Sequence, residues 1–276
     1  MSMTAFFMSV CCLTFLSVPQ PSHDLKIVTR RSLGQNLTYN VTEYFSGSRW
    51  REDTGLKMSN VNAHRLVTIV HHGDAVDQRF VLDMDAQEYV VYETDKNGGT
   101  VGAKTPPVQY SGGTLGIWID SNDTGERKQF YGYTARHTIT RERRVPGPGS
   151  CSNKSELDMD GWYIDPSVLP AWRQPLSSVT SFMVAGNCFD KTEVHRSGVK
   201  VGFPIKLTTT FLQPGSNLPA TFNTSEVVEF SEAPLDPALF VVPPDFRKVS
   251  ELTNMNKPHT PTAWERFKEW MQDLFR

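Results

Sequence analysis

Alternating apolar and polar side chains over residues 199–211 constrain the fold of this chain more than any other feature. Its apolar or β-branched members are Val199, Val201, Phe203, Ile205, Leu207, Thr209 and Phe211. Successive side chains of a strand point to opposite faces, so this period predicts a strand with one buried face. Such a face needs a partner, which Phe222, Val228 and Phe230 begin to supply on a second strand.

Pro204 lies inside this alternating run. Proline cannot donate a ladder hydrogen bond, and within sheets it is confined to edges, bulges and bends. We therefore expect the sheet to bend at Pro204.

Shorter runs of the same kind cover the first half of the chain. They predict strands over residues 25–31, 37–45, 49–52, 66–71, 79–84 and 88–93, the first two forming a hairpin and the whole set a meander. The Gly-rich and Pro-rich residues 94–116 predict a long surface loop. Two further strands are expected over residues 116–120 and 131–141, on either side of a turn at residues 122–125.

Length and charge exclude some classes of partner. The chain has 276 residues, of which 38% are hydrophobic, and this is enough for one large β-domain with a real core. Its formal net charge is -2, with both signs interspersed. We therefore expect neither a nucleic-acid footprint nor a polybasic membrane patch.

The N-terminal residues predict export. Residues 1–22 carry no charged side chain and include an apolar run, residues 6–16, about as long as the core of a signal peptide. The mature chain would then have no transmembrane span and would keep two cysteines, Cys151 and Cys188. Export favours a disulfide between them, and two free buried thiols in a cytosolic protein are the alternative.

The C-terminal residues predict an amphipathic helix over residues 262–276, after a polar linker at residues 251–261. Thr262 and Glu265 have the spacing of a capping box. Apolar residues recur at steps of three and four at Trp264, Phe267, Trp270, Met271, Leu274 and Phe275. We expect this helix to dock on the domain, with binding to a membrane surface or a partner as the alternatives.

One group of residues has the chemistry of metal ligands: His64, His71, His72, Asp74 and Asp77. His71 and His72 are adjacent, and adjacent side chains of a strand point to opposite faces. Only one of them could join a shared site, so no metal site is predicted.

Catalytic signatures are lacking in the sequence. It contains no Gly-x-Ser-x-Gly elbow, no cysteine–histidine signature, no phosphate-cradling loop and no dinucleotide fingerprint. Asp158 and Asp160 share a strand face, as do Asp83 and Asp85, and such carboxylate pairs are compatible with acid–base chemistry. Solvated strand surfaces carry the same pairs, so we expect no catalytic residue and no cofactor.

Two segments of the chain resemble the LolA-like group of bacterial envelope proteins. One is the run of residues 235–246, with Asp236-Pro237 and Pro243-Pro244, and the other is the hairpin-like run of residues 124–133. The resemblance implies a mainly β fold in which one large curved antiparallel sheet forms an open half-barrel over residues 24–250. A few short helices and the C-terminal amphipathic helix would complete it, in a periplasmic or secreted protein.

The same resemblance implies a function. In the LolA-like group the concave side of the half-barrel accepts lipoprotein acyl chains or other amphiphiles, because an open barrel leaves more apolar interior than its own side chains fill. We therefore expect a noncatalytic protein that binds a hydrophobic or lipid-like ligand. The concave face that binds it would be lined by Tyr39, Val41, Phe80, Leu82, Phe203, Ile205, Leu207 and Phe222. An envelope sensor that binds a regulatory protein partner and a hydrolase without a recognisable motif are the alternatives.

Overall fold

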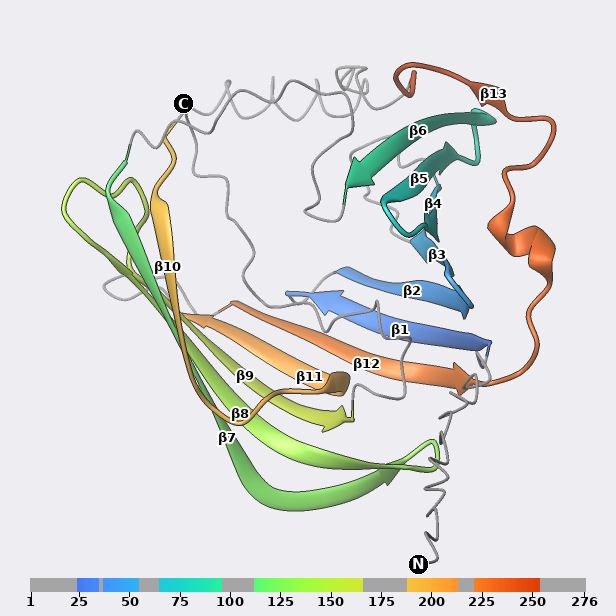
Figure 1. Cartoon of the computed structure of the whole chain (residues 1–276). Helices are drawn as coiled ribbons and strands as arrows, with labels where there is room; N and C mark the ends of the chain where they lie inside the picture. The colour runs from blue at the N-terminus through green and yellow to red at the C-terminus, as the bar shows by residue number, and fades with distance from the viewer. Residues whose placement is uncertain are drawn as a thin grey trace, which may run out of the picture.

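The computed structural model describes residues 24–34, 37–54, 65–95, 112–165, 188–212 and 221–253. These residues form one sheet of 13 strands in the order β10-β7-β8-β9-β11-β12-β1-β2-β3-β4-β5-β6-β13. The sheet curves round but stays open, and its long strands β7 and β8 bend most strongly (Figure 1). The prediction of a mainly β fold built on one large open sheet is confirmed.

The first half of the sheet is a meander, as predicted. Its strands are β1 (Leu25–Leu33), β2 (Leu37–Ser46), β3 (Arg49–Thr54), β4 (Leu66–His72), β5 (Val76–Asp83) and β6 (Glu88–Asp95). Each pairs antiparallel with the next, and β1 and β2 form the expected hairpin.

The second half contains the longer strands. They are β7 (Thr114–Phe130), β8 (Tyr133–Pro146), β9 (Ser155–Ile164), β10 (Lys191–Gly198), β11 (Phe203–Leu212) and β12 (Thr221–Ser231). A two-residue strand, β13 (Arg247–Lys248), follows a single turn of 3-10 helix at Pro237–Phe240. Strand β12 pairs with β11 on one side and with β1 on the other, so it joins the two halves into one sheet.

We expected an antiparallel sheet, but two of its strand pairs are parallel. β10 pairs parallel with β7, and β13 pairs parallel with β6, so both edges of the sheet are parallel. The sequence did not predict β10, because Lys191–Gly198 is polar and lacks an alternating apolar face. A strand that is exposed on both faces carries no period-two signal.

The turn predicted at residues 122–125 is wrong. β7 continues through these residues, and the chain reverses at Tyr131 and Gly132, both of which have positive φ. Gly125 also has positive φ, and the register of β7 against β8 shifts between Asp123 and Arg127. The glycine therefore serves a bulge inside a long strand, a conformation that needs the same backbone freedom as a turn.

A bend was predicted at Pro204, and the ladder is irregular at this residue. The register of β11 against β9 shifts between Pro204 and Lys206, which leaves Ile205 unmatched on β9. The regular strand begins at Phe203, four residues later than the alternation that starts at Val199.

The main core is built on the face of the first half of the sheet that carries Leu25, Ile27 and Phe45, which we call the inner face. It contains buried side chains from six strands: Leu25, Ile27, Phe45, Ala135, Ile164, Phe203, Ile205 and Val227. The tip of the β7–β8 hairpin folds over this core, because Tyr131 stacks on Phe230 at 5.8 Å and its hydroxyl donates to the Val227 carbonyl at 2.7 Å. The curl of the sheet is thus stabilised by contacts between strands that are not neighbours.

A second apolar cluster lies on the opposite, outer face of the first half. Val67, Ile69 and Leu82 pack there against Phe240, which the segment of residues 235–246 contributes. Arg51 donates to the Leu239 carbonyl at 2.9 Å, and Nε2 of His71 donates to the Phe240 carbonyl at 2.8 Å. In Figure 1 this orange to red segment leaves β12 and runs beside the first half of the sheet to β13.

Residues 251–253, at the start of the predicted linker, are attached to β6. Leu252 is buried, and Thr253 donates to Glu88 through its amide at 3.1 Å and its hydroxyl at 2.7 Å. These bonds from Thr253, with the ion pair from Arg247, lower the pKa of Glu88. The predicted signal peptide at residues 1–22, the C-terminal helix at residues 262–276 and most of the loop at residues 94–116 lie outside the described residues.

Within the described part of the chain, no helix is long and apolar enough to cross a membrane.

Phe240 provides a test of how strongly the segment of residues 235–246 is held. It is 1% exposed, whereas its neighbour Val241 is 58% exposed. We expect Phe240→Ala to lower the free energy of unfolding by about 3–5 kcal/mol through loss of burial and creation of a cavity. Val241→Ala should change it by less than about 0.5 kcal/mol. Urea denaturation of the two variants measures both, and equal effects would show that the segment does not unfold with the sheet.

Candidate functional site

Cross-strand neighbours show which of the predicted ligand-binding residues share a face, because directly opposed side chains point to the same side. Tyr39 is opposite Arg31, Arg31 is opposite Ser225, and Ser225 is opposite Leu207. This row places Tyr39 and Leu207 on one side of the sheet.

The same side carries Val41, and two more of the predicted residues pack in the main core. Val41 is opposite Thr29, which is opposite Val227, a member of the main core. Phe203 and Ile205 belong to that core as well. Tyr39, Val41 and Leu207 therefore lie on the inner face, and Phe203 and Ile205 pack in the main core on either side of the register shift in β11.

Phe80 and Leu82 lie on the outer face, which corrects the expectation of a single lined side. Phe45 is opposite Trp50, Trp50 is opposite Val70, and Val70 is opposite Arg79, the neighbour of Phe80. Phe80 and Leu82 pack instead under the segment of residues 235–246. The side chain of Phe222 lies outside the described part of the structure.

The inner face of β7, β8 and β9 carries an unusual mixture of buried side chains. Leu115, Ile117 and Ile119 of β7 form an apolar cluster separate from the main core. Cross-strand pairing places Ile117 opposite Arg144 and Ile119 opposite Glu142. An apolar strip on β7 therefore runs beside charged side chains on β8.

Glu142 and Arg144 form a buried ion pair on this face. Glu142 is 0% exposed and Arg144 is 5% exposed. Oε1 of Glu142 accepts a hydrogen bond from Nε of Arg144 at 2.8 Å, and Nη2 of Arg144 lies 2.7 Å from the same oxygen. Burial of either charge alone would be very costly, so each keeps the other in the interior.

Two buried polar atoms on the inner face have no hydrogen-bond partner within the described residues. They are Oγ1 of Thr138, which is fully buried, and Nε1 of Trp50, which packs beside the main core. Ser121 and Thr140, by contrast, satisfy each other at 2.9 Å. Nearly all buried polar atoms in proteins are paired, so each exception needs an explanation.

The buried part of the inner face is continuous with a more accessible part. Thr138 is opposite Gly161, and Gly161 is opposite Leu207, in the row that ends at Tyr39. Leu207, Phe211 and Tyr39 are all half-buried. The inner face thus passes from a buried polar and apolar region on β7–β9 to half-exposed apolar side chains on β11 and β2.

The histidine cluster of the sequence separates in the structure. His71 turns to the Phe240 carbonyl, whereas Nδ1 of His72 lies 3.0 Å from Oδ2 of Asp77. Both line an open depression of about 440 Å³ at the end of the β4–β5 hairpin, together with Gly73, Val76, Gln78 and Glu93. Within the described residues these histidines and aspartates do not gather into a metal-ligating group. His64 lies outside those residues.

One arrangement on the outer face has the connectivity that a hydrolase would require. Nδ1 of His137 lies 3.1 Å from Oγ1 of Thr124, and Nε2 lies 2.8 Å from Oδ1 of Asp160. A hydroxyl, a base and an orienting carboxylate are in sequence here. However, the Thr124 hydroxyl also donates to the His137 carbonyl at 3.3 Å, and the Asp160 side chain is 64% exposed. The geometry is therefore that of a solvated cross-strand network, in which Trp162 stacks on the imidazole at 4.9 Å.

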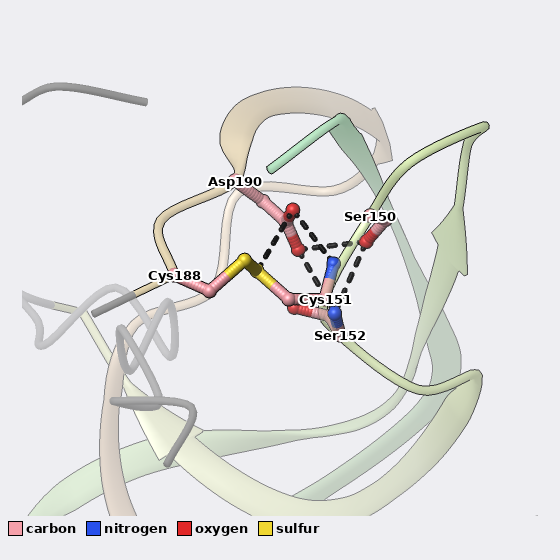
Figure 2. The surroundings of a disulfide bond; sticks show 5 residues. All are labelled: Ser150, Cys151, Ser152, Cys188 and Asp190. Carbon is pink, nitrogen blue, oxygen red and sulfur yellow. Dashed lines mark hydrogen bonds between the residues drawn. A yellow bond between two sulfur atoms is a disulfide. The ribbon is translucent and has the colours of Figure 1, made fainter. Parts of the chain in front are cut away.

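The predicted disulfide between Cys151 and Cys188 is present (Figure 2). It joins the chain just before β9 to the chain just before β10, across a sequence separation of 37 residues. A cross-link of this kind fits an oxidising compartment.

Asp190 organises the loop beside this disulfide. Its carboxylate accepts hydrogen bonds from the Ser150 hydroxyl at 2.7 Å, the Cys151 amide at 3.0 Å and the Ser152 amide at 3.0 Å. Burial alone would raise the pKa of Asp190, but these hydrogen bonds outweigh it and lower the pKa to about 2. Cys151, Cys188 and Asp190 lie close enough to hold a metal, yet sulfurs joined in a disulfide are not thiolate ligands.

No known family model matches this chain, and no curated protein matches it either. The LolA-like relationship therefore stays a prediction that rests on the two segments named above.

The buried residues Thr138, Glu142 and Arg144 escaped the sequence analysis. Along β8 the exposed residues Ile139, Arg141, Arg143 and Val145 alternate with them, so the apolar or charged character of a residue does not indicate its burial. The only available signal was the spacing of Glu142 and Arg144, because oppositely charged residues two apart on a strand share a face.

Substitution of Glu142 tests whether the ion pair with Arg144 contributes to the stability of the fold. We expect Glu142→Ala to lower the free energy of unfolding by about 3–5 kcal/mol, because Arg144 is left buried without its carboxylate. Arg141 and Asp158 form the matched exposed pair on the outer face at 2.7 Å. Asp158→Ala should therefore cost less than about 1 kcal/mol. Similar losses in urea denaturation would show that Glu142 and Arg144 are not energetically buried.

The pH dependence of stability tests the role of Asp190. Its folded pKa of about 2 lies below the ordinary value of 3.8, so the ionised carboxylate stabilises the fold above about pH 4. This contribution is lost as the pH falls through about 2. Urea denaturation between pH 5 and pH 2 should show a smaller loss of stability for Asp190→Asn than for the wild type. Parallel curves would contradict the assignment.

Proposed function

We propose that this protein is a noncatalytic exported envelope protein that binds a lipid-like amphiphile on the inner face of its sheet. The observation that carries the proposal is the coexistence of two unpaired buried polar atoms and half-exposed apolar side chains on that one face. A ligand with a polar group and an apolar chain offers a complement to both.

The apolar part of such a ligand has a suitable surface. Leu207 and Phe211 stand half-buried on β11, whereas Leu115, Ile117 and Ile119 on β7 are already buried. Each methylene that a ligand buries against surfaces of this kind contributes about 0.8 kcal/mol. An acyl chain therefore provides enough binding energy without a charged contact.

The ion pair between Glu142 and Arg144 limits which charge the polar part of the ligand can carry. Glu142 and Arg144 neutralise each other, so the buried region attracts neither sign of charge strongly. Oγ1 of Thr138 can donate or accept a hydrogen bond and the indole N–H of Trp50 can donate one, so each favours a neutral polar group. Their burial also sets a condition, since a ligand reaches them only when the chain that covers them moves aside.

The resemblance to the LolA-like group and the disulfide both support a periplasmic or secreted location for this protein. The LolA-like group, which residues 124–133 and 235–246 resemble, works in the bacterial envelope. The Cys151–Cys188 disulfide is of the kind that persists in exported proteins. A periplasmic or secreted site of action is the location that agrees with both.

A fluorescent palmitate analogue tests the proposal on the full chain. We expect saturable binding that Leu207→Glu weakens about tenfold or more, because an acyl chain would have to desolvate the introduced carboxylate. Ile139→Glu is the matched control, since Ile139 is an exposed aliphatic residue on the outer face of β8. Circular dichroism verifies that both variants are folded. An absence of binding by the wild type, or equal loss in both variants, would contradict the proposal.

A protein-interaction module is the second candidate, and one observation favours it. Every residue of the edge strand β10 is exposed. An exposed sheet edge binds extended protein segments by adding a strand.

A further inference from the structure

We propose that this protein self-associates through β10, which pairs antiparallel with β10 of a second copy around a two-fold axis. β10 is the last strand of the sheet, and no described strand pairs with its other edge. It has eight residues, contains no proline, and is exposed along its whole length. A strand of this kind is a template for strand addition.

The backbone hydrogen bonds determine which residues of β10 face outward. The Lys191 amide donates to the Gly113 carbonyl at 2.9 Å, and the Val199 amide donates to the Ser121 carbonyl at 2.8 Å. Alternate residues of a parallel strand turn their N–H and C=O groups to the same neighbour. Glu193, His195 and Ser197 therefore face β7, and Thr192, Val194 and Arg196 present their backbone groups at the free edge.

This pattern restricts the register of a two-fold pair. Two antiparallel strands exchange hydrogen bonds only between residues whose backbone groups face each other. With the axis at Val194, Val194 is opposite Val194 of the second copy, and Thr192 is opposite Arg196 of the second copy. All of these residues have outward backbone groups, so the ladder is complete.

Side-chain charge selects this register over its neighbours. With the axis at Val194, Glu193 is opposite His195 of the second copy, and both combinations are present by symmetry. Opposed residues without hydrogen bonds have their side chains closest, so an acidic residue is set against an imidazole. Moving the axis by one residue places Glu193 against Glu193 or His195 against His195, and like residues of this kind repel when charged.

The strand is also held in place before any partner arrives. The His195 ring stacks on Trp118 at 5.1 Å, and the Ser197 hydroxyl donates to Asp120 at 2.7 Å. The disulfide at Cys188 fixes the chain three residues before β10 begins. An ordered edge loses little conformational entropy when a second strand pairs with it. Lys191 lies 3.5 Å from Glu193 and competes for its carboxylate, but both side chains are highly exposed, so this pair is weak.

Val194→Pro tests the backbone part of the proposal. Proline removes an N–H that faces away from β7, so the native ladder is kept while the central pair of the dimer is lost. Sedimentation equilibrium of the full chain should give a concentration-dependent dimer for the wild type. The variant should raise its dissociation constant by about tenfold or more. A wild type that stays monomeric at all concentrations overturns the proposal, as does a Val194→Pro dimer of unchanged affinity.

A charge exchange tests the register without a backbone change. Glu193→Arg and His195→Glu should each weaken the dimer about fivefold, because each places like or unmatched groups opposite one another. The double variant restores an opposed acidic and basic pair and should recover most of the affinity. Additive loss in the double variant would overturn the register. Unchanged thermal melting of the monomer confirms that these results report on association.

Discussion

The pairing of β1 with β12 is the interaction on which the rest of this structure depends. β12 comes from near the end of the described chain and enters the sheet between β1 and β11, with partners as far apart as Lys26 and Ser231. Without it the meander of β1–β6 and the strands β7–β11 would be two separate sheets. The main core needs both halves, because Ile27 and Phe45 pack in it with Ile164 and Ile205. Continuity of the inner face, from Thr138 to Tyr39, follows from the same pairing.

Different parts of the sheet are covered by different elements. In the middle it curls so that the β7–β8 tip reaches β12, and the core is enclosed by the sheet itself. In the first half the segment of residues 235–246 covers the outer face and is held by Arg51 and His71. On β7–β9 the buried face contains charged and hydroxyl side chains beside an apolar strip. This last region has a composition unlike that of the apolar main core.

Several elements of the fold were predictable from local sequence patterns. The strands of the meander were predictable because each ends at turn residues and pairs with its neighbour in the chain. An irregular ladder at Pro204 was predictable because proline has no amide N–H to donate. The disulfide followed from two cysteines in a chain that reads as exported.

The failures have physical causes too. Residues 122–125 were predicted to form a turn, but they lie at a bulge in β7. A glycine with positive φ is typical of both conformations, so the sequence does not distinguish them. β10 depends on its backbone ladder, and Lys191–Gly198 has no buried face to reveal it. Leu82 and Val41 alternate in similar ways, but what covers each one lies far away in the sequence, and so the faces were assigned wrongly. Glu142 and Arg144 look like surface residues until the strand beside them is known.

The place of β12 in the sheet has a consequence for how the chain acquires its structure during synthesis. The ribosome completes residues 25–95 long before residues 221–231, and until then the second edge of β1 has no strand to pair with. Pairings so distant in sequence form slowly, and an open edge during that interval invites association with other nascent chains. A chaperone that binds the unfolded chain until β12 is synthesised would prevent this association.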